Sequence, residues 1–395
     1  MFEAVESSAS LAQLEQQVLD FWESEDIFAK SIEQRRDGKA YVFYDGPPFA
    51  TGLPHYGHLL AGTIKDVVPR YQTMRGRYVE RTFGWDCHGL PIESLAQSAL
   101  GLAGAPAIKA CGVERFNEQC RSMVLTYVKE WETTVKRLGR WVDFENGYKT
   151  MDPTFMESIW WVFKQLWNQG RIYKAHRIMP YSWKLNTPLS NFEANSNYQD
   201  VQDPSVTIRM KMLSLPEGLS LPDEITCYLL VWTTTPWTLP SNLAACVGPD
   251  IDYCLVQDGD SQVAYLMAKA RLDAYYKEKS EYKLLAEFKG SELADLKYEP
   301  IFDYFEQERP NAFRILVDKF VSTEDGTGIV HMAPAYGEDD YRICSANGIE
   351  LVDPLDEDGK FTAEVPDFAG QLCKDADKEI IRLLKDRGKL IHHST

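Results

Sequence analysis

The chain reads Asp45-Gly46-Pro47-Pro48-Phe49-Ala50-Thr51-Gly52-Leu53-Pro54-His55-Tyr56-Gly57-His58 between two segments of different periodicity. Residues 39–44, before this stretch, are a short apolar, β-prone run of the kind that is buried in a parallel sheet. Residues 57–75, after it, have helical apolar spacing, and residues 78–83 indicate a second strand. Strand, loop, helix and strand make one βαβ unit of an α/β fold. Ligands bind beyond the carboxyl ends of such strands, so we expect binding loops at residues 45–58 and 84–93.

Composition excludes several classes of protein. The chain has 395 residues, with 42 Lys and Arg against 59 Asp and Glu, and the net charge is −17. That length suggests two or three domains, and 44% hydrophobic with 26% charged residues is ordinary for a globular protein. The acidic balance argues against a basic surface that coats nucleic acid, but it allows a nucleic acid held in one local groove.

The sequence also bears on the compartment. No apolar run approaches the roughly 18–20 residues that span a bilayer. Residues 1–10 contain no basic residue, unlike a signal or transit peptide. The eight cysteines form no CxxC pair, which argues against a zinc ribbon. We therefore expect a cytoplasmic protein with reduced thiols, no metal site and no membrane partner.

The predicted secondary structure changes near residue 180. Helical segments predominate before it, including residues 152–169, whose Trp160, Trp161 and Trp167 we expect to pack in the core. After it, short β-branched runs separated by Pro, Gly and Asp predict a β-rich barrel or sandwich-like domain. These runs lie at residues 206–210, 226–235, 253–256, 262–267, 314–317 and 328–331.

The expected domain organisation follows from this change from helical segments to short strands. We expect a first domain at residues 1–180 and a β-rich domain at residues 181–390, with a helix at residues 374–387. Residues 391–395 would start a return of the chain to the first domain.

His55 and His58 give the loop its chemistry. They are three residues apart, so both can lie on one side of the first helical turn. A helix N-terminus attracts phosphate through its free N–H groups, and two imidazoles there can donate hydrogen bonds as charge builds up on a phosphate. Gly57 leaves room for a flat base to approach. Taken as four residues alone, the pattern is equally compatible with two surface histidines in a loop.

The longer stretch favours the first interpretation. Residues 45–58 resemble the HIGH motif of the class I aminoacyl-tRNA synthetases, in the form that isoleucyl-tRNA synthetases carry. The run Phe83-Gly84-Trp85-Asp86-Cys87-His88-Gly89-Leu90-Pro91-Ile92-Glu93 resembles the next signature of that family, again at the end of a strand. Valyl enzymes differ in both places, and leucyl enzymes resemble these stretches less closely. The resemblance covers essentially the whole chain.

The resemblance implies the first half of a Rossmann-like nucleotide fold that binds ATP with Mg²⁺. It implies that His55, Gly57 and His58 bind ATP. The two histidines would hold the phosphates while the carboxylate of isoleucine attacks the α-phosphate. Positioning and charge stabilisation do most of the catalysis in such a step.

The same resemblance implies an amino-acid pocket and partners. Gly46 and Pro47 would line the pocket, and Asp86 would pair with the α-ammonium of isoleucine. Asp86 as a simple turn residue stays an alternative. The implied substrates are isoleucine, ATP and tRNA(Ile), and the implied enzyme is a monomeric isoleucine–tRNA ligase.

A second resemblance lies in the β-rich domain, where the chain reads Trp232-Thr233-Thr234-Thr235-Pro236-Trp237-Thr238-Leu239-Pro240-Ser241-Asn242. Alone, this run is compatible with an edge strand, because Thr is β-prone. It resembles the threonine-rich peptide of the inserted editing domain of isoleucyl, valyl and leucyl enzymes. Residues 326–341 resemble the other editing signature of these enzymes.

The editing resemblance implies hydrolysis of misattached valine. Isoleucine and valine differ by one methylene, which a pocket distinguishes by only about 1–3 kcal/mol, and isoleucine enzymes are the standard example of this problem. Asp340 would hold the α-ammonium of the misattached amino acid, while Asp339 is a solvated neighbour. The ester and its attacking water would be surrounded by Thr233, Thr234, Thr235, Asn242 and His331.

One signature of the family is missing. The KMSKS motif of the second half of the nucleotide fold is absent, and Lys277-Glu278-Lys279-Ser280 is a look-alike that we interpret as a solvated charge run. We therefore expect a fragment that lacks this motif and the anticodon-binding domain and that is not competent as a ligase alone. Two alternatives to a ligase fragment stay open: a free-standing editing hydrolase, and a catalytically silent module that binds the amino acid or the tRNA end.

Overall fold

The computed structural model describes residues 10–307 and 309–395. The chain separates into two compact units, with the boundary between Lys174 and Ala175. None of the helices in the described part is long and apolar enough to cross a membrane. We expect no targeting signal in residues 1–10. Residues 1–9 of this segment lie outside the described residues.

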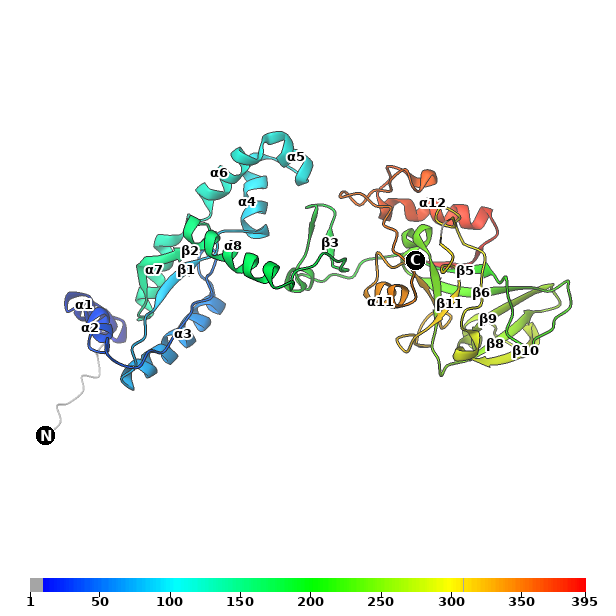
Figure 1. Ribbon diagram of the computed structural model, residues 1–395, viewed down its shortest axis with the longest axis horizontal. Coiled ribbons are helices and arrows are strands. Elements are labelled where there is room, and N and C mark those ends of the chain that lie inside the picture. The colour runs from blue at the N-terminus through cyan, green and yellow to red at the C-terminus, as the bar shows by residue number, and fades with distance from the viewer. Residues whose placement is uncertain (1–9, 308) are drawn as a thin grey trace. The chain divides into compact units, whose positions relative to one another are not determined.

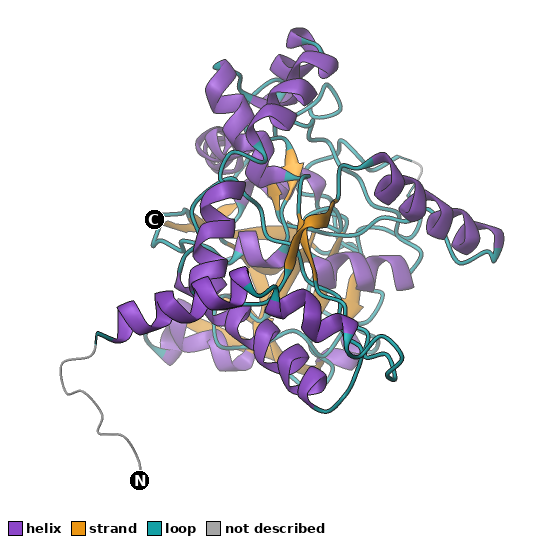
Figure 2. Ribbon diagram, turned by 90° about the vertical axis from the view of Figure 1, so that its left-hand side faces the viewer, coloured by secondary structure: helices purple, strands orange, loops and turns teal. Residues whose placement is uncertain are grey.

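Unit 1, up to Lys174, contains mainly helices around a small parallel pair of strands (Figures 1 and 2). Its elements are α1 (Leu11–Ser24), α2 (Ile27–Glu33), α3 (Tyr56–Met74), β1 (Thr82–Trp85), α4 (Leu90–Leu100), α5 (Gly104–Cys111), α6 (Val113–Met123), α7 (Val128–Arg137), β2 (Asp143–Lys149) and α8 (Pro153–Asn168).

The expected βαβ arrangement is only partly formed. β1 pairs in parallel with β2, and the run at residues 39–44 contributes one isolated parallel bridge, between Ala40 and Tyr78. A second parallel bridge joins Phe49 to Asp86. The prediction of a strand over residues 39–44 is therefore wrong beyond that bridge, although the segment runs parallel to its expected partner. The bridge between Phe49 and Asp86 still brings the loop after residue 44 and the loop after β1 side by side.

The core of unit 1 forms where β1 packs against α7. Phe83 and Trp85 of β1 and Trp131 and Val135 of α7 are all buried in one cluster. Gly84 between the two aromatic residues lies against the ring of Tyr148, so that a Cβ would come within 2.3 Å of it. The close approach of β2 to β1 therefore requires glycine at this position.

The expectation that the tryptophans of α8 pack in the core is wrong. Trp160, Trp161 and Trp167 are 66%, 62% and 62% exposed. α8 buries none of its residues. Ile159, Phe163 and other apolar side chains are exposed around the helix as well. Helical spacing of aromatic residues predicts an inward face only where a neighbouring element covers that face.

Unit 2, from Ala175, is built around one nine-stranded sheet. Its strands and helices are β3 (Tyr181–Ser182), β4 (Thr187–Pro188), α9 (Asn191–Ala194), β5 (Ser205–Lys211), β6 (Thr226–Thr233), η1 (Pro236–Ser241), β7 (Ala244–Val247), β8 (Asp252–Asp258), β9 (Val263–Ala268), η2 (Lys269–Arg271), α10 (Leu272–Tyr275), η3 (Lys279–Glu281), β10 (Tyr282–Lys289), η4 (Gly290–Leu293), β11 (Ile315–Val317), β12 (Ile329–Met332), α11 (Glu338–Ala346), η5 (Pro366–Phe368), α12 (Cys373–Asp386) and β13 (Leu390–Ser394).

The sheet branches at β6. The strand order is β10-β8-β9-β6-β12-β7-β11, and β6 also pairs with β5, which pairs in turn with β13. The pairing is mixed, since β6 runs parallel to β9 and β12 but antiparallel to β5. Each of the six expected strand runs overlaps a strand, and β7 and β10 are additional. The last strand, β13, which we expected to begin a return to the first domain, pairs with β5 in this sheet.

The core of unit 2 lies between the sheet and α12, which runs alongside it (Figure 1). α12 buries Ala376, Ile380 and Leu384 at a spacing of four residues, so one helical face meets the sheet. η1, which follows β6, packs against α12. This arrangement places the threonine-rich run and the start of α12 in direct contact.

Candidate active sites

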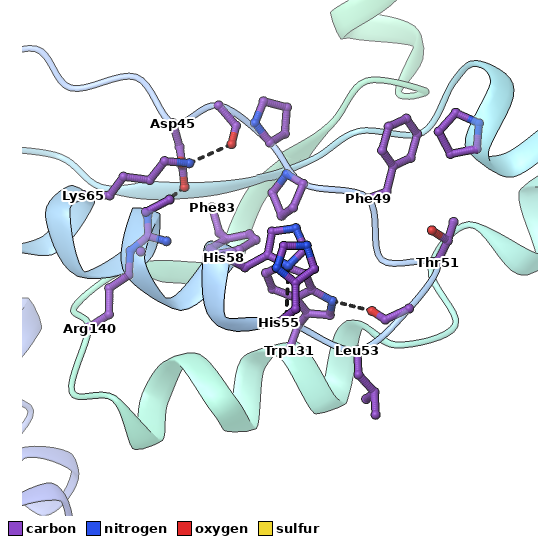
Figure 3. A pocket seen from close by; sticks show the side chains of 17 residues that line it. Asp45, Phe49, Thr51, Leu53, His55, His58, Lys65, Phe83, Trp131 and Arg140 are labelled. Atoms are coloured by element: carbon purple, nitrogen blue, oxygen red, sulfur yellow. Dashed lines mark hydrogen bonds and ion pairs between the residues drawn. The ribbon is translucent and has the colours of Figure 1, made fainter. Parts of the chain in front are cut away.

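The first candidate site is the N-terminus of α3, where His55 is the N-cap residue (Figure 3). The Nδ1 atom of His55 accepts from the backbone N–H of Gly57 at 3.1 Å. The Nδ1 atom of His58 accepts from the backbone N–H of His55 at 3.2 Å. Since an Nδ1 that accepts carries no proton, both neutral imidazoles carry their proton on Nε2. The local fold therefore leaves two Nε2–H donors for a ligand.

The two rings are stacked, with centroids 3.6 Å apart. The ring of His58 also lies 4.7 Å from that of Trp131. Burial lowers the pKa of His58 below its usual value, and the neighbouring His55 and Lys65 lower it further. A neutral His58 at pH 7 can donate from Nε2 without adding a like charge beside Lys65, and the helix N-terminus adds partial positive charge. The site is suited to an anion with several oxygens.

A cavity of about 490 Å³ opens at these histidines (Figure 3). Gly46 and Pro47 line it together with His55 and His58. Gly57 and Asp86 do not line it.

Asp86 lies beside the loop of this cavity. Its N–H donates to Pro48 O at 2.9 Å, and its carboxylate accepts from His88 N at 3.4 Å. The side chain is half-buried.

Sequence reasoning missed a buried charge cluster in the wall of this cavity. Asp45, whose side chain is 0% exposed, pairs with Lys65 at 2.6 Å and with Arg140 at 2.8 Å. Lys65 also donates to Gly46 O at 2.9 Å, which fixes the carbonyl next to the cavity. One signal was available, because Lys65 follows His58 by seven residues, or two helical turns, on one face of α3. Nothing local pointed to Arg140, 95 residues from Asp45.

The second candidate site lies in unit 2, where β6 ends and η1 begins. Thr233 Oγ1 lies 3.1 Å from Thr235 Oγ1, which lies 3.3 Å from Thr238 Oγ1. Thr238 Oγ1 lies 2.7 Å from His331 Nε2 and donates to Thr235 O at 2.8 Å. We call these four residues, with Asn242, the threonine–histidine cluster. Thr234 is exposed and stands outside its hydrogen bonds.

The cluster has a fixed direction of hydrogen bonding. Asn242 Oδ1 accepts from Tyr298 at 2.8 Å, and its Nδ2 donates to Ala244 O at 2.9 Å and to His331 Nδ1 at 3.3 Å. His331 Nδ1 is thus an acceptor, so the proton sits on Nε2 and is donated to Thr238. Burial lowers the pKa of His331 to about 4. His331 is therefore neutral at pH 7 and orients hydroxyl groups rather than accepting a proton.

Asp340 lies in the first turn of α11 and is tied to the end of β12, the strand that carries His331. Its Oδ2 accepts from Ala333 N at 2.8 Å. Burial raises the pKa of Asp340 to about 6, although the hydrogen bond from Ala333 opposes the shift. Gly337 allows this position, because a Cβ there would lie 2.7 Å from the Asp340 carboxyl carbon.

Asp339, the neighbour of Asp340, points elsewhere. It pairs with Arg342 at 2.8 Å, and both side chains are about half exposed. The two adjacent carboxylates thus differ in burial and partner.

The structure brings most of the predicted editing residues together and adds three that the sequence did not single out: Thr238, Gly337 and Asp377. The sequence signal for Thr238 was its place in the threonine-rich run. Asp377 accepts from Trp237 N at 2.8 Å across 140 residues, a contact without local signal. Among the described residues, no group of three or more His, Cys, Asp or Glu side chains could hold a metal ion.

Comparisons with known proteins agree with the resemblance of this chain to class I tRNA synthetases. The family model described as tRNA synthetases class I (I, L, M and V) matches residues 17–342. Isoleucine–tRNA ligase of Treponema denticola is 51% identical over 418 residues, which cover 99% of this chain and 38% of the relative. Isoleucine–tRNA ligase of Protochlamydia amoebophila is 50% identical over 396 residues, which cover 100% of this chain and 37% of the relative.

A solved editing domain, that of the P. falciparum cytosolic leucyl-tRNA synthetase, is 11% identical and covers 49% of this chain and 100% of its own, at a TM-score of 0.36. That score is too low to support an argument about the fold. The chain spans about 38% of the length of the first curated relative.

Proposed function

The chain belongs to the class I tRNA synthetases, and on this premise we propose that it serves in the ATP-dependent attachment of isoleucine to tRNA(Ile). The observation that carries the proposal is the pair of Nε2–H donors that His55 and His58 present at the N-terminus of α3, in one cavity with Gly46 and Pro47. Because the chain spans about 38% of the first relative, the proposal concerns its share of the reaction, the part of the site for isoleucine activation that unit 1 carries.

In that step a carboxylate oxygen of isoleucine attacks the α-phosphorus of ATP, and the bond to the bridging oxygen breaks as pyrophosphate leaves. His55 and His58 donate to phosphate oxygens on which negative charge develops, and the N-terminus of α3 adds its dipole. Mg²⁺ accompanies the ATP phosphates and neutralises part of their charge. Asp45, held by Lys65 and Arg140, keeps the loop of Gly46 in place beside the amino acid.

Binding of an isoleucyl-adenylate analogue with an uncleavable sulfamate link tests this assignment by calorimetry on the intact chain. A hydrogen bond to a charged group contributes about 1.5–3 kcal/mol, so His58→Ala should weaken binding by about ten- to a hundredfold. His392→Ala, which removes an exposed histidine of β13 in unit 2, is the matched control and should bind like the wild type. An analogue that binds equally to the wild type and His58→Ala contradicts the phosphate role.

We propose that Asp86 pairs with the α-ammonium of isoleucine. Its backbone N–H holds the loop at Pro48, so the side chain lies next to the loop that carries Gly46 and Pro47. Removing one partner of a charged pair raises the free energy of binding by about 2–5 kcal/mol. Asp86→Ala should therefore weaken the analogue strongly and leave the affinity for ATP unchanged. A parallel loss of both affinities would point to a collapsed loop instead.

We propose a second activity for unit 2, the hydrolysis of valine misattached to tRNA(Ile). It is favoured by the threonine–histidine cluster and by Asp340, a half-buried carboxylate held at Ala333 N, two residues beyond His331, that can anchor an α-ammonium. Thr233, Thr234, Thr235, Asn242 and His331 are assigned to the surroundings of the ester. Water attacks the ester carbonyl, the bond to the ribose oxygen breaks, and that oxygen takes up a proton. His331, with its low pKa, positions hydroxyl groups and does not serve as the base.

Deacylation of valyl- and isoleucyl-tRNA side by side tests this activity. Valyl-tRNA should be hydrolysed weakly and isoleucyl-tRNA spared, because one extra methylene does not fit a smaller pocket. Asp340→Ala should abolish the hydrolysis, whereas Asp339→Ala, which removes an exposed neighbour, should retain it. Equal hydrolysis of both esters would refute the proposal. Binding of the aminoacylated end without hydrolysis would favour the silent-module alternative.

A further inference from the structure

Asp377 is a buried carboxylate that no sequence motif marks. It lies in the first turns of α12 and is 4% exposed. Its Oδ1 accepts from the backbone N–H of Trp237 at 2.8 Å. Burial raises the pKa of Asp377 to about 6, while the hydrogen bond from Trp237 and the charge of Lys374 oppose the shift. Asp377 is thus ionised at neutral pH, and its carboxylate accepts a hydrogen bond from one backbone N–H, that of Trp237.

That donor belongs to the start of η1. Thr235 is the N-cap residue of η1, Pro236 is the first helical residue and Trp237 the second. An N-cap threonine usually turns its own hydroxyl back to accept from the N–H of the second or third helical residue. Thr235 makes no such side-chain cap. Its backbone oxygen accepts from Thr238 N at 3.0 Å, and Asp377 accepts from Trp237.

The hydroxyl of Thr235 is thereby left for the threonine–histidine cluster. It stands between Thr233 Oγ1 at 3.1 Å and Thr238 Oγ1 at 3.3 Å. If it capped η1 instead, it would have to leave the line of hydroxyl groups that ends on His331. The helix end and the cluster therefore compete for one hydroxyl, and the carboxylate from α12 removes the competition.

We propose that Asp377 is a positioning residue of the hydrolytic site, which caps η1 in place of Thr235 and so reserves the Thr235 hydroxyl for the ester and its water. The inference rests on the hydrolysis proposed above for unit 2. It concerns a residue that touches neither the ester nor the water and acts through Thr235.

The first test is the rate of valyl-tRNA hydrolysis by the intact chain. Asp377→Ala should lower kcat by about tenfold, the usual effect of losing one well-placed hydrogen bond, with KM within about twofold. Asp377→Asn retains an acceptor oxygen and should restore most of kcat. Glu379→Ala is the matched control, because Glu379 lies on the same helix and accepts from Gln371 at 2.8 Å, away from η1. A rise in KM with unchanged kcat would overturn the proposal.

A double-mutant cycle separates positioning from general support of the fold. If Asp377 acts through the Thr235 hydroxyl, Asp377→Ala should add little to the loss in kcat that Thr235→Val causes alone. A residue that only supports the fold would lower kcat further in the Thr235→Val background. Additive losses in the double variant therefore refute the role of Asp377.

A second measurement does not depend on hydrolysis. Scalar couplings of the labelled Thr235 methyl group report the χ1 rotamer of that side chain. The rotamer should change in Asp377→Ala, as the hydroxyl turns to the N–H of Trp237, and stay unchanged in Asp377→Asn and Glu379→Ala. A wild type that fails to hydrolyse valyl-tRNA while the rotamer changes as expected would refute the proposed activity and leave the capping contact established. An unchanged rotamer in Asp377→Ala would overturn the capping inference itself.

Discussion

Replacing Asp340 by Asn should stabilise unit 2 at neutral pH. Burial raises the pKa of Asp340 from 3.8 to about 6, a shift of about two units, and each unit corresponds to about 1.4 kcal/mol. The ionised carboxylate thus lowers the free energy of unfolding by about 2–3 kcal/mol above pH 6. Asn removes the charge and retains an oxygen that can accept from Ala333 N.

The sign of the pH dependence follows from this raised pKa. Below the unfolded value near 4, Asp340 is protonated in both states and contributes nothing to the difference between wild type and variant. As the pH rises through about 6, the unfolded chain releases its proton first, and the wild type loses stability. The advantage of Asp340→Asn should therefore be largest at pH 7, smaller by about 1–2 kcal/mol at pH 5 and close to zero at pH 4.

Hydrogen exchange of the intact chain measures this difference, because peptides from β6 and β12 report the unfolding of the sheet in unit 2. The opposing titration of His331 is common to both proteins and cancels in the comparison. Asp339→Asn is the matched control: its carboxylate is exposed and paired with Arg342, so its removal should change stability by at most about 1 kcal/mol. An Asp340→Asn protein that is less stable than the wild type at pH 7, or whose advantage does not shrink at pH 5, refutes the reasoning.

Three further outcomes are expected. Gly337→Ala places a Cβ 2.7 Å from the carboxyl carbon of Asp340, so it should raise the KM for valyl-tRNA at least about tenfold in deacylation kinetics, and an unchanged KM would show that the carboxylate does not anchor substrate. Arg140→Ala leaves the fully buried Asp45 with one cation and should destabilise unit 1 by about 3–5 kcal/mol in urea titration; a loss below 1 kcal/mol would mean that water screens the pair. Trp161→Gln changes an exposed side chain and should alter the unfolding free energy of the chain by less than about 0.5 kcal/mol, so a large loss would restore the core interpretation of α8.

The sequence was most informative where function depends on residues close together in the chain. The spacing of His55 and His58 and their place at a helix start predicted a shared site, and the structure places both in one cavity with Gly46 and Pro47. The strand pattern of unit 2 was also readable, because short β-branched runs between Pro and Gly indicate strands wherever they pair. Pairing partners could not be read, and the branching of the sheet at β6 came only from the structure.

The two wrong predictions, a strand over residues 39–44 and a buried face of α8, have a common physical cause. Residues 39–44 are β-prone, yet they form only a bridge between Ala40 and Tyr78, because a strand exists only where neighbouring backbone completes its hydrogen bonds. The tryptophans of α8 have core spacing, yet no described element of unit 1 buries them. Propensity and periodicity describe what a segment can do, whereas burial is decided by what the rest of the fold brings against it.

The polar networks show the same limit at the level of single protons. Which histidine nitrogen carries hydrogen was not in the sequence, but at α3 it follows from contacts only two or three residues long. In unit 2 the equivalent decision for His331 depends on Asn242, 89 residues away, and we infer that the place of the Thr235 hydroxyl in the cluster depends on Asp377, farther still. A motif therefore identifies the groups that face the substrate, while the groups that orient them come from distant elements. It is at those distant positions, rather than within the motifs, that substitutions can separate positioning from chemistry.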